Sequence, residues 1–160
     1  MSKPLANAAE QQFNTLLDQI LQLEKLIGKA YLKFEKTAFT DELAKCLSPT
    51  STDGPAHLQR LKLITASFAT NGTATEKLPA LSISIGKKSM ANDLQLIAVA
   101  LGLQNQKLAI YEMLHPLASG LALTPIAQLI EQTITDNRNT NTWLRQIIQN
   151  IIVPKLQTGS

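Results

Sequence analysis

Cysteine and aromatic residues are scarce in this chain of 160 residues, and each scarcity narrows the possible functions. Cys46 is the only cysteine, so the chain cannot form an internal disulfide or hold a metal cluster through several thiolates. We expect this thiol to be buried and structural rather than reactive. Aromatic residues make up only 4% of the chain, which leaves few rings on which nucleic-acid bases could stack.

Charge of one sign is not concentrated in any long segment. The net charge is +3, but basic residues are interspersed with acidic ones, and only Lys87-Lys88 and the region 25–36 look locally basic. Binding of nucleic acid usually requires a clustered basic face, so we expect no nucleic-acid partner. Ordinary solvated helix faces explain the lysines.

Long hydrophobic runs are missing as well. No stretch of about 18 apolar residues could span a bilayer, and residues 1–5 lack the apolar block of a signal peptide. We therefore expect a cytoplasmic protein with no membrane contact. With 44% hydrophobic and 17% charged residues, the chain is long enough for a single domain over 1–160, with a core over about 5–153.

Signatures of common enzyme classes are missing too. No glycine-rich loop follows a strand as a phosphate-binding loop would, and no serine, histidine and acid are grouped as in a nucleophilic site. The stretch 82–86 does not match a nucleophile elbow, because that turn needs a central sheet. The sequence therefore favours a protein without enzymatic activity.

Helical periodicity is what the chain has in abundance. Apolar residues recur at helical spacing over 5–34, 40–68, 92–120 and 124–153. Four long helices with modest connections predict an all-α four-helix bundle. The residues expected to face the core are, in chain order, Phe13, Leu17, Ile20, Ile27, Tyr31, Leu43, Leu47, Leu61, Ile64, Phe68, Leu94, Ile97, Leu101, Leu108, Tyr111, Ile126, Ile130, Leu144 and Ile147.

Prolines predict a break within the second helix. Pro49 and Pro55 favour a kink or split near 48–52, because proline removes a backbone hydrogen bond and clashes with the preceding turn. Segment 73–91 is undetermined, and a short helix or turn across the bundle is preferred there to an isolated strand. Four local signals mark the other helix ends: a stop at Asn71-Gly72, a cap at Asn92, a start at Thr124-Pro125 and a stop before Pro154.

Polar side chains interrupt the apolar stripes of all four helices near their midpoints. In the third helix, Gln104 falls on the stripe and Lys107 flanks it. Because antiparallel neighbours overlap at their midpoints, these side chains should meet in one buried layer, where an unpaired polar group costs roughly several kcal/mol. They must bond to one another or bind something, as inward carboxylates and histidines do in di-iron and di-manganese bundles. The other expected members are Glu24, Asp53, His57, Asp136 and Asn137.

Several motifs along the chain resemble those of a known family. They are Leu23-Glu24-Lys25, the stretch 53–61 with His57 and Arg60-Leu61, Asn92-Asp93-Leu-Gln-Leu-Ile with Tyr111 downstream, and Leu129-Ile-Glu-Gln-Thr-Ile. Together they resemble the YciE/YciF family of ferritin-like bacterial stress proteins over about 13–151. The resemblance implies a ferritin-like antiparallel four-helix bundle, with a short extra helix between the second and third helices, and commonly a dimer.

The resemblance also implies a metal site, from which this chain departs. It makes Glu24 the ligand from the first helix and Asp53 the counterpart of a glutamate in the second, with His57 one turn later. The family's third helix tends to carry two glutamates three residues apart. This chain has Gln104 and Lys107 at those positions.

The fourth helix departs from the family as well. A pair of adjacent glutamates and a later aspartate in the family match Asp136, Asn137 and Asn141 here. The candidate metal ligands that remain are Glu24, Asp53, His57 and Asp136.

These substitutions lead to a hypothesis about function. A paired-metal site needs roughly four carboxylates, and an ammonium beside the site would repel cations, so we expect a hydrogen-bonded network in place of the metals. Lys107 would then act as counter-ion to Glu24, Asp53 or both. We expect a stress-associated, non-enzymatic structural or interaction protein that needs no cofactor and forms a homodimer. Ile148, Ile151 and Ile152 offer a possible dimer face.

Other interpretations of the same residues stay open. The chain could retain one iron or manganese ion, or an altered pair, with oxidase or peroxide-handling chemistry. Lys107 could instead extend to solvent, Glu24 could lie on the surface, and His57 could be a satisfied structural histidine. Gln104 and Asn137 could simply bond to each other. A small-molecule pocket could also open at the break between 49 and 55.

Overall fold

The structure is a computed structural model, and it describes residues 4–68, 77–79, 81, 83, 84 and 86–159. Helices dominate the described residues, which contain no β-strand. In chain order the elements are α1 (Pro4–Thr37), α2 (Asp41–Cys46), α3 (Pro49–Thr52), α4 (Gly54–Ser67), α5 (Met90–Gly120), α6 (Thr124–Ile147), the π-helical turn η1 (Ile148–Ile152) and α7 (Val153–Gln157).

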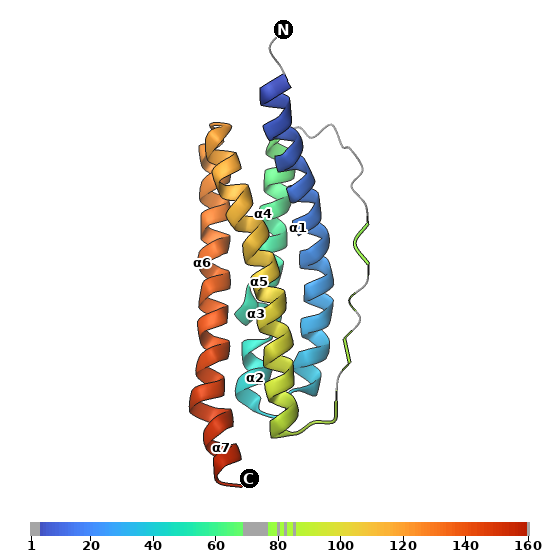
Figure 1. Cartoon of the computed structure of the whole chain (residues 1–160), viewed down its shortest axis with the longest axis vertical. Coiled ribbons are helices and arrows are strands. Elements are labelled where there is room, and N and C mark those ends of the chain that lie inside the picture. The colour runs from blue at the N-terminus through green and yellow to red at the C-terminus, as the bar shows by residue number, and fades with distance from the viewer. Residues whose placement is uncertain (1–3, 69–76, 80, 82, 85, 160) are drawn as a thin grey trace.

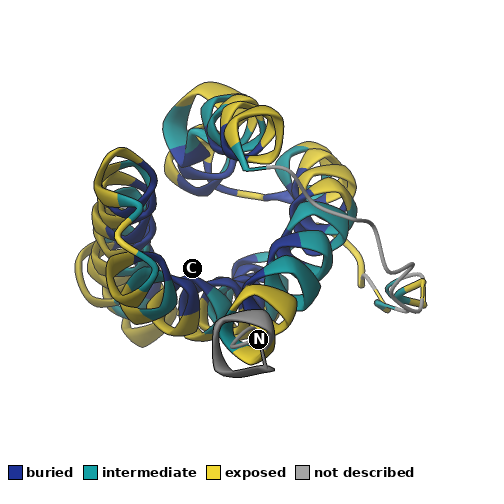
Figure 2. Ribbon diagram, turned by 90° about the horizontal axis from the view of Figure 1, so that it is seen from above, coloured by how far each residue is buried: buried dark blue, intermediate teal, exposed yellow. Residues whose placement is uncertain are grey.

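The helices form a four-helix bundle in which neighbours run antiparallel. In Figure 1, α1 and α6 run downward, whereas α5 and the segment from α2 to α4 run upward. Helix α1 contacts α4 and α5, and α6 contacts α5 and the segments α2, α3 and α4, so the ring closes. The end-on view in Figure 2 shows the buried faces turned inward. Among the described helices, none is both long and apolar enough to cross a membrane.

The second helix of the bundle is divided into α2, α3 and α4, as the prolines predicted. Thr40 caps α2 and Ser48 caps α3, each accepting a hydrogen bond from a backbone N–H three residues later. Pro49 and Pro55 stand in the first turns of α3 and α4, where a missing N–H is not needed. Between them Asp53 adopts left-handed backbone angles, with φ 57°. The chain therefore changes direction at this point before α4 begins.

Three helix ends differ from the sequence prediction. Helix α5 begins earlier than expected: Ser89 is its cap and accepts a hydrogen bond of 3.0 Å from the backbone N–H of Asn92. Thr124 is the first residue of α6 rather than its cap. Pro154 does not stop the last helix but lies in the first turn of α7, after the π-helical turn η1. After this wider turn, Pro154 stands in the first turn of α7, where the backbone N–H that proline lacks is not needed for a helical hydrogen bond.

Helices α4 and α5 run in the same direction along the bundle (Figure 1). The predicted stop at Asn71-Gly72 lies outside the described residues. Helix α4 ends at Ser67, and the described residues between 77 and 89 contain no helix, so they do not form the expected short extra helix. They lie along α1, where the backbone N–H of Leu78 donates to Gln22 Oε1 at 2.8 Å.

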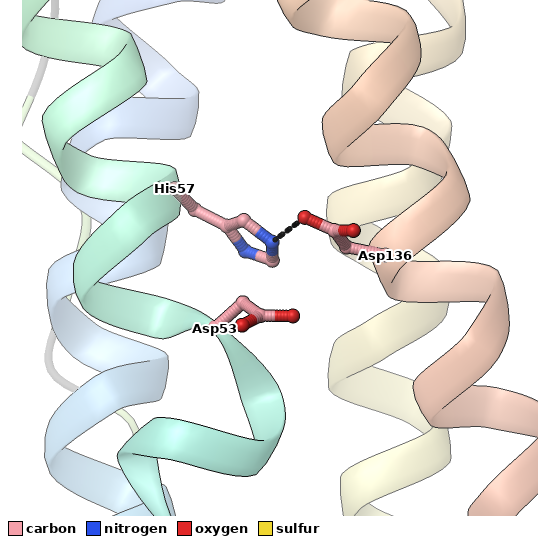
Figure 3. A group of neighbouring side chains, drawn as sticks. All are labelled: Asp53, His57 and Asp136. Atoms are coloured by element: carbon pink, nitrogen blue, oxygen red, sulfur yellow. Dashed lines mark hydrogen bonds and ion pairs between the residues drawn. The ribbon is translucent and has the colours of Figure 1, made fainter.

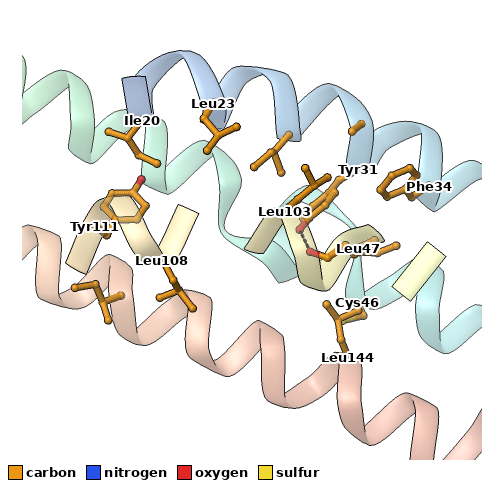
Figure 4. Packing of buried hydrophobic residues seen from close by; sticks show 14 of the residues in the cluster. Ile20, Leu23, Tyr31, Phe34, Cys46, Leu47, Leu103, Leu108, Tyr111 and Leu144 are labelled. Atoms are coloured by element: carbon orange, nitrogen blue, oxygen red, sulfur yellow. Dashed lines mark hydrogen bonds between the residues drawn. The ribbon is translucent and has the colours of Figure 1, made fainter. Parts of the chain in front are cut away.

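The core contains most of the residues that periodicity placed there, and Figure 4 shows part of it. The inward faces of α1 and α6 are buried as predicted, and Cys46 is buried too. On α5, Ile97, Leu108 and Tyr111 are buried as predicted, but Leu94 and Leu101 are only partly buried, so the prediction is wrong at those two positions. This helix has α1 on one side and α6 on the other, and its buried face is correspondingly wide.

The predicted dimer face late in the last helix is also wrong. Ile152 is fully buried, and Ile148 and Ile151 are partly buried against the core of the same chain. Helix packing thus uses these side chains within the bundle, because α5 lies against η1 and α7.

Candidate functional site: a buried polar layer

Glu24, on the inner face of α1, is the centre of the polar layer. Its carboxylate is 3% exposed and contacts three side chains from other helices. Lys107 of α5 places Nζ 3.0 Å from Oε1. Tyr111, one turn later on α5, donates a hydrogen bond of 2.5 Å to Oε2, and His57 Nδ1 of α4 lies 3.5 Å from the same oxygen. Every one of these partners is itself buried.

Two opposing effects act on the pKa of Glu24. Burial raises the pKa, because a carboxylate loses its hydration. The Lys107 charge, the nearby His57 side chain and the hydrogen bond from Tyr111 lower it by more, so the pKa falls to about 2. Glu24 is therefore a carboxylate at neutral pH, and Lys107 is its nearest cation.

His57 connects Glu24 to a second acidic residue across the bundle. Its Nε2 lies 3.2 Å from Asp136 Oδ2 of α6, as the dashed line in Figure 3 marks. Arg60, one turn after His57 on α4, places Nη1 2.7 Å from the same oxygen and 3.2 Å from Thr133 Oγ1. Asp136 is half-buried, with its side chain 20% exposed. The carboxylate of Asp136 is thus shared between a buried histidine and an arginine.

Asp53 is close to this pair without being bonded to it. Potential ligand atoms of Asp53, His57 and Asp136 lie within 4.8 Å of one another, and Figure 3 shows the three side chains converging from the α3–α4 break, α4 and α6. Asp53 caps α4 by position, but its side chain makes no capping hydrogen bond. In the described part of the chain, Lys107 forms its ion pair with Glu24 and not with Asp53.

A neutral branch of the layer joins α5, α6 and α1. Gln104 Nε2 donates to Asn137 Oδ1 at 3.1 Å, and Asn137 Nδ2 donates to the Thr133 carbonyl at 2.9 Å. Tyr31 of α1 donates a hydrogen bond of 2.8 Å to Gln104 Oε1. Both amides are fully buried, so these bonds satisfy groups that water cannot reach.

The two buried tyrosines keep their protons in this environment. Burial and then the nearby Glu24 charge raise the pKa of Tyr111 well above its ordinary value, and the hydrogen bond to Glu24 raises it further. Burial and the Glu24 charge also raise the pKa of Tyr31. Both phenols therefore act as hydrogen-bond donors at neutral pH.

The structure brings together most of the side chains expected in the layer. Glu24, His57, Gln104, Lys107 and Asn137 are all buried, so the alternatives of a solvent-exposed Lys107 and a surface Glu24 are wrong. The expected bond between Gln104 and Asn137 is present.

Asn141, which the resemblance matched to a family aspartate, does not join the layer. Its amide donates a weak hydrogen bond of 3.4 Å to Asn105 in an exposed position. Asn141 is partly buried, and its Oδ1 atom is buried without a hydrogen-bond partner in the described part of the chain.

Sequence reasoning assigned no bonding role to Arg60, Tyr111 or Thr133. Helical spacing could have suggested them, because Tyr111 follows Lys107 by four residues, and Thr133 precedes Asn137 by four. Arg60 is three residues after His57, which puts both on one side of α4.

The bundle and its polar layer define the class of protein. Four antiparallel helices that present polar side chains to one buried level form a ferritin-like arrangement. The crystal structure of the E. coli stress protein YciF has this fold: it matches with a TM-score of 0.76 at 20% sequence identity, covering 92% of this chain and 98% of that chain.

The chain belongs to the family described as a domain of unknown function (DUF892), whose family model matches residues 8–157. The resemblance predicted from the sequence motifs is therefore confirmed. A search of curated proteins finds no match to this chain.

Proposed function

We propose that this chain is a stress-associated ferritin-like protein in which a charge-paired network takes the place of a dinuclear metal centre, and that it acts as a non-enzymatic structural or interaction protein. One observation carries the proposal: the Lys107 ammonium lies 3.0 Å from Glu24 Oε1, both side chains being 2% exposed. The stress association is supported by the likeness to E. coli YciF.

The buried donors do not fit a pair of metal ions. A metal bound by Glu24 would lie close to the Lys107 ammonium, and two cations repel strongly in a poorly solvated interior. Gln104 and Asn137 offer neutral amide oxygens, and each already takes part in hydrogen bonds. Neutral amides are poor principal ligands for iron or manganese. The layer therefore lacks the negative charge that a dinuclear site needs.

Acidic and basic side chains alternate along the network. The row begins with Lys107, which lies 3.0 Å from Glu24, and Glu24 lies 3.5 Å from His57. It continues through Asp136, which lies 3.2 Å from His57 and 2.7 Å from Arg60. Each acid is flanked by groups that carry or can carry positive charge. Such a row can offset the desolvation of its members without any bound ion.

Metal analysis tests the proposal directly. The protein is purified without chelator from cells grown with added iron and manganese, and its metal content is measured by inductively coupled plasma mass spectrometry. We expect far less than one ion per chain. Near-stoichiometric iron or manganese that is lost on Glu24→Gln substitution would refute the proposal.

Restoring the acidic residues provides the complementary test. The double variant Gln104→Glu/Lys107→Glu removes the ammonium and adds two carboxylates beside Glu24. We expect Mn²⁺ to raise the melting temperature of this variant and to leave that of the parent unchanged. The variant is refolded with Mn²⁺ present, because three buried carboxylates repel one another without a cation. No metal-dependent stabilisation would argue against replacement of a metal site by Lys107.

A single-ion site is the second candidate, favoured by the convergence of Asp53, His57 and Asp136 within 4.8 Å. An ion there would have to displace Arg60, which lies 2.7 Å from Asp136. It would also need His57 to be neutral. Binding of one Mn²⁺ or Fe²⁺ that is abolished by Asp53→Asn, with Glu24→Gln as the matched control, would favour this candidate, together with the oxidase or peroxide-handling chemistry that such an ion allows.

The assembly and location of the protein are further parts of the proposal. A homodimer is consistent with the common state implied by the family resemblance. Exposed large apolar side chains available for it include Leu32, Phe39, Leu63 and Met113. Light scattering coupled to size-exclusion chromatography distinguishes a dimer from a monomer, and fractionation of cells tests the proposed cytoplasmic location.

A further inference from the structure

A cavity of about 340 Å³ lies between α1 and the break that separates α3 from α4. Its size is near the lower end of the roughly 300–1,000 Å³ of small-molecule sites. We propose that this cavity binds a small apolar carboxylate, with the carboxylate at the mouth beside Lys25 and Lys29 and the apolar part inside. This site goes beyond the proposed function, because a ligand is bound at Lys25 and Lys29 outside the polar layer, while Glu24 and Lys107 of the layer line its inner end.

The break in the second helix opens one wall of the cavity. Pro49, Thr52, Gly54 and Pro55 line it, at the point where α3 ends and α4 begins. A continuous helix would place side chains and backbone across this space, but Asp53 with its left-handed backbone angles turns the chain away. The opening is therefore built into the backbone and does not depend on side-chain positions alone.

The opposite wall is kept open by the absence of a side chain. Gly28 lies within α1 and lines the cavity. A Cβ atom at this position would meet nothing within 4 Å, so tight packing does not require the glycine. Glycine also destabilises a helix interior relative to alanine. The missing side chain at Gly28 leaves this part of the cavity open.

The interior of the cavity is mostly apolar, with one polar end. Ile27, Leu32, Leu47 and Leu58 are among the apolar side chains that line it. At the inner end lie Glu24 and Lys107. An ammonium has three N–H donors. In the part of the chain that the structure describes, Glu24 is the partner recorded for Lys107 Nζ, so donors remain for an acceptor atom at the inner end of a ligand.

Charge at the cavity selects an anion. Lys25 and Lys29 are exposed and four residues apart on α1, so both stand on the same side of the mouth. The acidic residue that lines the cavity, Glu24, is already paired with Lys107. The two outer lysines thus leave an excess of positive charge at the entrance. A carboxylate there would stay hydrated while its apolar chain occupies the interior, and a terminal hydroxyl could reach Lys107.

Calorimetric titration of the full chain at low ionic strength tests the proposal, with octanoate and its terminally hydroxylated derivative as probes. We expect one octanoate to bind per chain. Octanoate should bind at least tenfold more tightly than octylamine, a difference of about 1.4 kcal/mol in binding free energy. The hydroxylated acid should bind at least as tightly as octanoate. No heat and no thermal stabilisation at millimolar octanoate would overturn the proposal, as would equal affinity for octylamine.

Two pairs of variants locate the binding site. Gly28→Leu should fill the mouth and weaken octanoate binding by about tenfold or more, whereas Gly102→Leu should leave it within about twofold. Gly102 is the matched control, because it lies within α5, has nothing within 4 Å of a Cβ and does not line the cavity.

Charge reversal at the rim, Lys25→Glu/Lys29→Glu, should weaken octanoate and strengthen octylamine, and these exposed positions tolerate substitution. Octanoate binding that survives both Gly28→Leu and the charge reversal would show that the ligand binds elsewhere and would overturn the assignment.

Discussion

Removal of the Lys107 ammonium alone should destabilise the protein far more than removal of both the Lys107 ammonium and the Glu24 carboxylate. In Lys107→Met, the Glu24 carboxylate stays buried with only Tyr111 and His57 as partners. Loss of one member of a buried pair typically costs about 3–5 kcal/mol. In the double variant Lys107→Met/Glu24→Gln, no unpaired charge remains, and the free energy of unfolding should return to within about 1–2 kcal/mol of the parent.

Two quantities support this magnitude, and the attraction between Lys107 and Glu24 contributes to both. At 3.0 Å, two unit charges attract by about 5.5 kcal/mol if the effective dielectric constant is about 20. The pKa of Glu24 is about 2 against an ordinary 4.5, which corresponds to roughly 3 kcal/mol in favour of the ionised form. Both figures exceed the value of an exposed ion pair, which is about 0–1 kcal/mol.

A double-mutant cycle measured by urea unfolding, followed by far-ultraviolet circular dichroism, isolates the coupling between Glu24 and Lys107. The same cycle at Glu112 and Arg138 is the control, since that pair is as close, at 2.7 Å, but its side chains are 49% and 62% exposed. We expect a coupling of at least about 2 kcal/mol for the buried pair and less than about 1 kcal/mol for the exposed one. Equal couplings would refute the reasoning.

Two further predictions concern titration. Because Glu24 has a pKa of about 2 when folded and about 4.5 ordinarily, its carboxylate contributes stability in full above pH 4.5 and loses it as the pH falls toward 2. The difference in the free energy of unfolding between the parent and Glu24→Gln should therefore shrink over this range, and a constant difference in urea titrations at several pH values would contradict the assignment. Burial raises the pKa of Cys46 to about 12, so a disulfide reagent at pH 8 should react with the native thiol more than about a thousandfold more slowly than with the urea-unfolded chain. Comparable rates in the two states would show that this thiol is accessible.

Much of the architecture could be predicted from local pattern. A helix buries one face, so the spacing of apolar residues identified the inward positions of α1 and α6 without knowledge of the neighbouring helices. Proline acts on its own backbone, so the break at Pro49 was readable too. Local signals failed where two of them compete: Ser89 and not Asn92 is the cap of α5, and η1 accommodates Pro154 within the last helix.

The layer of polar residues was predictable as a set but not as a network. The sequence predicted burial of Gln104 and Asn137 because each lies on an apolar stripe. Helical spacing places residues of one stripe on the same face of the helix. Their mutual hydrogen bond was one option among several. The stripe predicted for α5 was wrong at Leu94 and Leu101, because the rotation of this helix against α1 and α6 sets its buried face, and the spacing alone does not give that rotation.

The amino-acid sequence by itself determined that polar and charged groups would be buried at one level of an all-α bundle, since helical spacing follows from backbone geometry alone. Only the tertiary structure decided which of these side chains contact one another. Lys107 meets Glu24 and not Asp53, and His57 lies between Glu24 and Asp136. These pairings depend on the axial offset and rotation of each helix against its neighbours, which arise from packing of the whole core and from no single helix.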